Sequence, residues 1–139
     1  KNGQDFLTIL LPSGRKLYYA RPFVEINEKG RLGLHYQGVN QKTRQWEIIP
    51  TYGGKLAENV VQAIARDCLA ESLIRLTDAG YQIVFHVHDE VVLEVQASTS
   101  EAVDAHLDTV TGIMSEPIRW APGLILKAEG FASQYYQKN

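Results

Sequence analysis

The chain has 139 residues, of which 45% are hydrophobic and 22% are charged. This length and composition predict one folded globular domain and exclude collagen-like, fibrous and intrinsically disordered proteins. No apolar run approaches the roughly 18 residues that cross a bilayer, and the N-terminus lacks the layout of a signal peptide, so we do not expect a membrane protein. The single cysteine, Cys68, excludes an internal disulfide framework and makes a reducing cytoplasm the expected setting.

The net charge of −2 is distributed unevenly along the chain. Residues 1–75 hold 11 of the 14 Lys and Arg and 7 of the 16 Asp and Glu, a balance of +4, which leaves −6 for residues 76–139. The basic half could face a polyanion such as nucleic acid. Charge alone leaves a second interpretation open, in which the two halves lie against one another or in solvent.

The first third of the chain is rich in residues that favour strands. Short apolar or alternating runs separated by turn residues predict a small antiparallel sheet, with strands at 6–11, 15–20 and 31–36. The stretch 38–54 is polar and contains Pro50, Gly53 and Gly54, so we expect it to be a connection.

The rest of the chain alternates helices and strands. Residues 55–79 contain neither Pro nor Gly and predict a long helix that ends at Gly80. Two β-rich runs, 82–88 and 91–95, predict a tight hairpin with Asp89 and Glu90 between them. A capping box at Ser98 and Glu101 predicts a second helix that ends at Pro117, and a last strand is expected at 124–129. The order predicts an α+β fold with two helices packed on an antiparallel sheet.

The hairpin tip is the first candidate site. Asp89 and Glu90 are adjacent acids between apolar strands, and an oxygen-only pair suits Mg²⁺ bridged to substrate phosphates. A solvated acidic turn is the alternative, because Asp is common in turns. His86 and His88 are expected on one face of their strand, and together with Asp89 they could instead ligate Zn²⁺ in a mononuclear metal hydrolase.

The long helix carries a second candidate site. Lys55, Asn59, Gln62 and Arg66 fall within an arc of roughly 60° at helical spacing. Two cations and two amides on one stripe suit a phosphate backbone and the acceptors of the minor groove, so we predict DNA binding there. A solvated helix face would explain the same charges.

These two sites together resemble a known family. The segment Val87-His88-Asp89-Glu90-Val91-Val92, following a helix that reads Glu58-Asn59-Val60-Val61-Gln62, resembles motif C and the preceding helix of the DNA polymerase I family, also called family A. The Tyr52-Gly53-Gly54-Lys55 lead-in and the β-rich insert before it look most like phage or prophage members. The closing 131–138 segment resembles the aromatic, basic C-terminus of such enzymes, so the similarity covers about residues 45–139.

The resemblance implies a role for each matching residue. Asp89 would be the catalytic carboxylate that binds Mg²⁺, and Glu90 the neighbouring acid that positions the metal or its waters. His88 would lie against the primer terminus, and Gln62 would contact the primer-template duplex through its minor groove. The implied partners are a DNA primer-template and deoxynucleoside triphosphates, in the cytoplasm of a bacterium or a phage-infected host cell.

Two parts of the family pattern have no counterpart in the chain. Neither motif A, an Asp-centred palm strand, nor motif B, a fingers helix with Lys and Tyr, is found, and both would lie upstream of Lys1. We therefore expect the C-terminal piece of a polymerase palm, organised as a single domain with a β-rich insert over 1–50 and a palm portion over 51–139. Such a piece would be inactive alone and could form a homo-oligomer. A further hypothesis is a non-catalytic nucleic-acid-binding or oligomerising module in which the basic half, residues 1–75, makes the contacts.

Overall fold

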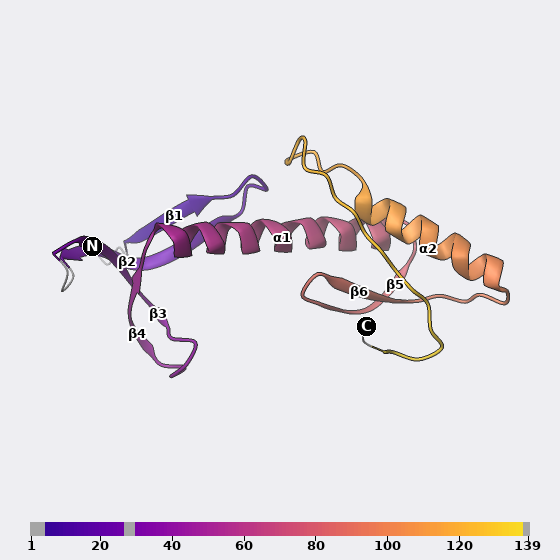
Figure 1. The fold of residues 1–139 in the computed structure, drawn as a ribbon, viewed down its shortest axis with the longest axis horizontal. Helices are drawn as coiled ribbons and strands as arrows, with labels where there is room; N and C mark the ends of the chain where they lie inside the picture. Colours follow the sequence, from indigo (N-terminus) through magenta and orange to yellow (C-terminus); the bar gives the residue numbers. More distant parts are fainter. Residues whose placement is uncertain (1–4, 27–29, 138–139) are drawn as a thin grey trace. The chain divides into compact units, whose positions relative to one another are not determined.

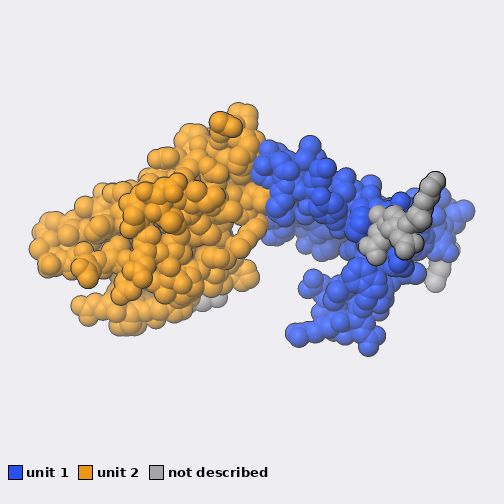
Figure 2. All heavy atoms as spheres, turned by 180° about the vertical axis from the view of Figure 1, so that it is seen from behind, with its two compact units in different colours: residues 1–64 blue, residues 65–139 orange. Residues whose placement is uncertain are grey.

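The structure, a computed structural model, describes residues 5–26 and 30–137 and contains two compact units, residues 1–64 and residues 65–139 (Figure 2). The elements in chain order are β1 (Phe6–Leu10), β2 (Lys16–Ile26), β3 (Leu32–Val39), β4 (Trp46–Thr51), α1 (Gly53–Asp78), β5 (Gln82–Val87), β6 (Glu90–Glu94) and α2 (Ser100–Ser115) (Figure 1). The predicted α+β class is confirmed, with the strands divided between a four-stranded and a two-stranded antiparallel sheet. The expected division into 1–50 and 51–139 stays a prediction.

The four-stranded sheet of the first unit pairs its strands in chain order, β1-β2-β3-β4. Strand β2 is longer than the predicted 15–20 because it continues through a bulge between Ala20 and Phe23. At this bulge Arg21 has a φ of 47°, and its backbone N–H donates to the carbonyl of Asp5 over 2.8 Å. The extra residue lets the strand cross Pro22 and pair again with β3.

Strand β4 corrects the expectation of an irregular connection over 38–54. Residues 46–51 pair with β3 in a regular register that places Pro50 opposite His35. Proline lacks a backbone N–H, but β4 is an edge strand, where one side of the strand needs no ladder partner. The polar residues that suggested a connection form the preceding turn, where the Asn40 side chain accepts from the backbone N–H of Lys42 over 2.8 Å.

Helix α1 ends where the sequence predicted. Gly80 has a φ of +87°, its N–H donates to the Thr77 carbonyl, and the N–H of Tyr81 donates to the Leu76 carbonyl. These two bonds form a Schellman motif, which satisfies the last carbonyls of the helix.

Helix α2 begins one residue later than the predicted capping box. Thr99, not Ser98, is the N-cap: it is extended, and its hydroxyl accepts the N–H of Ala102 over 3.2 Å. Hydrogen bonds to the Glu101 carboxylate from its own backbone N–H and from the Thr99 hydroxyl lower the pKa of Glu101. The helix ends at Ser115, and the guanidinium of Arg75 donates to the carbonyls of Glu116 and Pro117 just beyond it.

The strand predicted at 124–129 is not formed. This segment is irregular, and the N–H of Ala128 donates to the Ser115 hydroxyl over 3.0 Å rather than to a strand carbonyl. Its apolar residues are unevenly covered, since Ile125 is 92% exposed. The Ala128 N–H is therefore bound at the end of α2, the Leu124 N–H donates to the Ala121 carbonyl, and the ladder of β5 and β6 does not include this segment.

Each unit has a small core. The buried side chains are Leu11, Tyr19, Thr51 and Ala63 in the first unit and Leu69, Ser72, Leu76 and Ile118 in the second. Leu76 is completely buried. Within residues 5–26 and 30–137, no helix is both long enough and apolar enough to span a membrane.

Candidate active site

The β5–β6 hairpin has a loop of two residues, His88 and Asp89. Val87 pairs with Glu90 and His86 pairs with Val91, so Glu90 is the first residue of β6 and not part of the loop. This corrects the prediction that Asp89 and Glu90 form the turn. The reason is the register: pairing Val87 with Glu90 closes the ladder one residue earlier than a loop of two acids would allow.

His88 adopts a backbone conformation that few side chains favour. Its φ is +54°, in the left-handed region where glycine is the usual residue. A two-residue hairpin loop requires a positive φ at its first central position, because only then does the turn match the twist of the strands. The tip is thus held in a strained turn, and strained residues of this kind cluster at functional sites.

The two carboxylates of the tip differ in their surroundings. Asp89 is exposed, whereas Glu90 is half-buried and held by the β-ladder. Both are oxygen donors, which fits Mg²⁺, an ion that commonly takes one or two protein carboxylates together with waters and substrate phosphates. Among the residues that the structure describes, no three His, Cys, Asp or Glu side chains gather as a metal-binding group. The tip by itself offers two carboxylates, fewer than the three side chains that would form a metal-binding group.

The histidine-based alternative loses its geometric basis. His88 lies in the loop with a positive φ, so the alternation that would place it on the same face as His86 is broken there. His86 Nδ1 lies 3.2 Å from Nη1 of Arg66, and because a guanidinium can only donate, this nitrogen is the acceptor. In the described part of the chain, His86, His88 and Asp89 do not form a metal-binding cluster.

The four predicted DNA-binding residues of α1 have distinct environments. Gln62 and Arg66 are exposed, and Arg66 contacts the hairpin through His86. Lys55 is exposed and pairs with Glu58 at 3.0 Å, and the hydrogen bond from Lys55 to that carboxylate raises the pKa of Lys55. Asn59 is half-buried, and its amide donates to the Tyr19 hydroxyl over 3.0 Å. The Asn59 side chain thus contributes to packing in the first unit.

Two contacts of the hairpin were not predicted from the sequence. The Arg66–His86 bond joins residues 20 positions apart, and no spacing rule indicates such a pair. The ring of Tyr136 lies edge-on to Phe85, with centroids 5.1 Å apart, so the aromatic tail contacts β5. The aromatic residues near the C-terminus were the available signal for this second contact.

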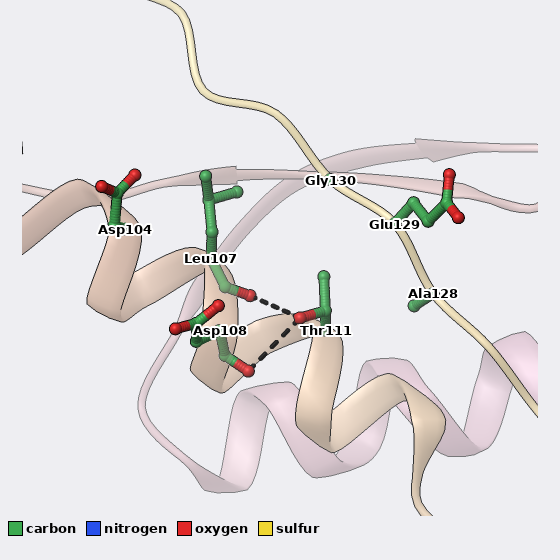
Figure 3. Close-up of a pocket in the computed structure, with 7 residues that line it drawn as sticks. All are labelled: Asp104, Leu107, Asp108, Thr111, Ala128, Glu129 and Gly130. Atoms are coloured by element: carbon green, nitrogen blue, oxygen red, sulfur yellow. Dashed lines mark hydrogen bonds between the residues drawn. The ribbon is translucent and has the colours of Figure 1, made fainter.

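A separate surface depression of about 570 Å³ lies in the second unit, between α2 and the segment 128–130 (Figure 3). Three carboxylates line it, those of Asp104, Asp108 and Glu129. Thr111 also lines it, and its hydroxyl donates to the carbonyls of Leu107 and Asp108 (Figure 3). An acidic, open surface of this kind repels phosphate, so we do not assign DNA or nucleotide binding to it.

Comparison with known proteins identifies a relative. The chain is 52% identical, over 134 residues, to a protein of Bacillus phage SP02 named DNA polymerase. The match covers 96% of the chain but only 20% of the relative, so the chain spans about a fifth of that protein's length. No family model and no solved structure matches the chain. The hairpin with His88 and Asp89 at its tip therefore belongs to a sequence that is similar to part of a phage DNA polymerase.

Proposed function

We propose that the chain is the motif C portion of a family A DNA polymerase of phage or prophage type. The observation that carries this proposal is the 52% identity over 134 residues to a protein named DNA polymerase. The hairpin supports it, because the two-residue turn combines a histidine at positive φ with an exposed carboxylate. In the complete enzyme the reaction would be template-dependent nucleotidyl transfer assisted by two Mg²⁺ ions, which stabilise the attacking and leaving oxygens.

The two acids of the hairpin would have different roles in binding the metal. Asp89 is exposed at the loop, so its carboxylate can bind the ion directly. Glu90 is anchored in β6 and half-buried, which suits a residue that orients the metal or its waters. His88, in the same loop, would lie against the primer terminus.

The helix residues would contact the DNA. Gln62 is exposed and can reach an acceptor in the minor groove, which carries little sequence information. Arg66 is held by His86 beside β5, so its guanidinium is placed near the hairpin and could contact a phosphate. Lys55 would add a second cation, and Asn59 would act indirectly through Tyr19.

The isolated chain would be inactive. Phosphoryl transfer by two metal ions needs carboxylates from separate segments and a positive group on the incoming triphosphate. The hairpin contributes two neighbouring acids from one segment. A primer-extension assay on the purified 139-residue chain with Mg²⁺ and deoxynucleotides should therefore give no template-dependent incorporation.

The metal assignment is tested in a full-length polymerase that contains this sequence. Asp89→Asn should nearly abolish nucleotide incorporation and leave primer-template affinity largely unchanged, because it removes a metal ligand without removing a DNA contact. Glu94→Gln is the matched control, since Glu94 is an exposed acid at the other end of β6. Normal turnover by Asp89→Asn, or an equal loss in both variants, would contradict the motif C assignment.

A further inference from the structure

One face of the four-stranded sheet is covered with exposed aromatic side chains. Opposite residues of an antiparallel pair lie on the same face, and the register joins Phe6 to Ala20, Ala20 to Gln37 and Gln37 to Ile48 across the whole sheet. Residues two positions away along a strand share that face. We call this surface the aromatic face; its large aromatic members are Phe6, Tyr18, Phe23 and Trp46. They are 46%, 62%, 36% and 63% exposed.

The opposite face of the sheet is the one that packs on α1. Tyr19 alternates with Tyr18 along β2, is 6% exposed, and accepts the hydrogen bond from Asn59 of the helix. Its ring lies edge-on to Tyr36 at 4.9 Å. The hydrophobic core of this unit therefore lies against part of this opposite face, whose far end stays exposed at Leu32, and none of the four aromatic residues of the aromatic face belongs to the core.

The side chains of the aromatic face are held in place by one another. Phe6 and Tyr18 lie edge-to-face at 5.9 Å, and Phe23 stacks on His35 at 5.1 Å with the rings 12° apart. On the neighbouring strand, the amide oxygen of Gln37 accepts from the guanidinium of Arg21 at 3.2 Å and from the indole N–H of Trp46 at 3.5 Å. Fixed rings lose little conformational entropy when a ligand stacks on them.

The charge of this unit favours an anionic ligand. Residues 1–64 contain nine Lys and Arg and five Asp and Glu. Lys16 lies on the aromatic face opposite Leu10, and Arg21 reaches it through Gln37. Glu25, near the far end of β2, is an acidic member of the same face.

We propose that the aromatic face binds a single-stranded nucleic acid. Unpaired bases offer π-faces that stack on exposed aromatic rings, while nearby cations contact the backbone, and such binding tolerates any sequence. A duplex keeps its bases stacked on each other and cannot offer those faces. A second copy of the chain suits the surface less well, because it would bring two copies of the same net-positive unit together. The proposal concerns residues 1–64 and does not depend on the role of Asp89.

Binding is measured by fluorescence anisotropy, with the 139-residue chain titrated into a labelled oligothymidylate of about 20 nucleotides. Tyr18→Ala and Trp46→Ala should each weaken binding by about fivefold or more, the loss expected when one stacking ring is removed. Trp46→Phe should restore most of the affinity. Leu32→Ala is the matched control, because Leu32 is 76% exposed on the other face of the sheet. Circular dichroism of each variant verifies that the sheet is intact.

Three further outcomes separate the possible ligands. An abasic oligomer of the same length, which keeps the phosphates but lacks bases, should bind much more weakly, and Asp89→Asn should bind like the unmodified chain. Equal affinity for the abasic oligomer or for a duplex would overturn the proposal, because binding would then need charge alone. It would equally be overturned if the alanine variants bound normally, or if the oligomer did not bind and Trp46→Ala only changed a dimer into a monomer.

Discussion

Replacing His88 with glycine tests whether the backbone strain at the hairpin tip lowers the stability of the fold while the His88 side chain serves function. His88 has a φ of +54° and an exposed side chain, so the substitution removes backbone strain and few contacts. We expect His88→Gly to stabilise the fold and, if the proposed function holds, to lower nucleotide incorporation by a full-length polymerase that contains this sequence. The two effects have opposite signs because the strain is local, whereas the imidazole would act on the primer terminus.

The size of the stability effect follows from two opposing terms. A non-glycine residue in the left-handed region costs about 1–2 kcal/mol. Glycine loses more conformational freedom on folding than other residues, at a cost of about 0.5–1 kcal/mol. The net gain is therefore between about zero and about 1.5 kcal/mol, which at a typical urea dependence of about 2 kcal/mol per molar raises the unfolding midpoint by up to about 0.75 M.

Urea unfolding followed by far-UV circular dichroism measures this gain, and His86→Gly is the matched control. His86 lies in β5 and bonds to Arg66, so glycine there should lower the midpoint. The reasoning about strain is refuted if His88→Gly lowers the midpoint as much as His86→Gly does. The functional part is refuted if the stabilised variant extends primers at the normal rate.

Two further predictions concern the second unit. Leu76→Ala should destabilise it by about 2–5 kcal/mol, because Leu76 is completely buried and the substitution leaves a cavity. Urea unfolding measures this loss, and Ile74→Ala is the control because Ile74 is exposed. An equal loss of stability in both variants would contradict the burial of Leu76. Burial raises the pKa of the Cys68 thiol above its ordinary value of 9.0, so the reactive thiolate forms only at higher pH. Alkylation of Cys68 by iodoacetamide, followed by mass spectrometry, should be slower than alkylation of free cysteine. Its rate should still increase above pH 9. A rate that already levels off at pH 8 would disprove the shift.

Hydrophobic periodicity and the positions of Gly and Pro predicted the helices and strands that depend on local sequence. Helix α1 lacks Pro and Gly after its first turn, and its end before Gly80 was found as expected, but it begins at Gly53, two residues earlier than predicted. Strand β4 was missed because Pro50 counts against a strand unless the strand lies at an edge, and edge position depends on the tertiary fold. The strand expected at 124–129 failed for the related reason that a strand needs a partner, which the alternation of its residues cannot guarantee.

The candidate site was predicted as residue types rather than as geometry. The hairpin and the exposed Asp89 follow from the sequence, but the register that moves Glu90 into β6 and His88 into the loop does not. A difference of one residue decides which side chain carries the strain. The contact between Arg66 and His86 depends on how α1 packs on the hairpin, and the aromatic face depends on which side of the sheet the helix covers. Both the Arg66–His86 contact and the exposure of the aromatic face are set by tertiary packing, which the sequence pattern alone does not give.

The strand order of the first sheet has a consequence for synthesis on the ribosome. All pairings of β1, β2, β3 and β4 join neighbours in the chain, so the four-stranded sheet needs no partner beyond residue 51. At a translation rate of about 5–20 residues per second, the 43 residues from the end of β4 at Thr51 to the end of β6 at Glu94 take roughly 2–9 s to make. A sheet with such local pairing can form within milliseconds to seconds. The N-terminal sheet can therefore be complete before the hairpin that carries Asp89 has been translated.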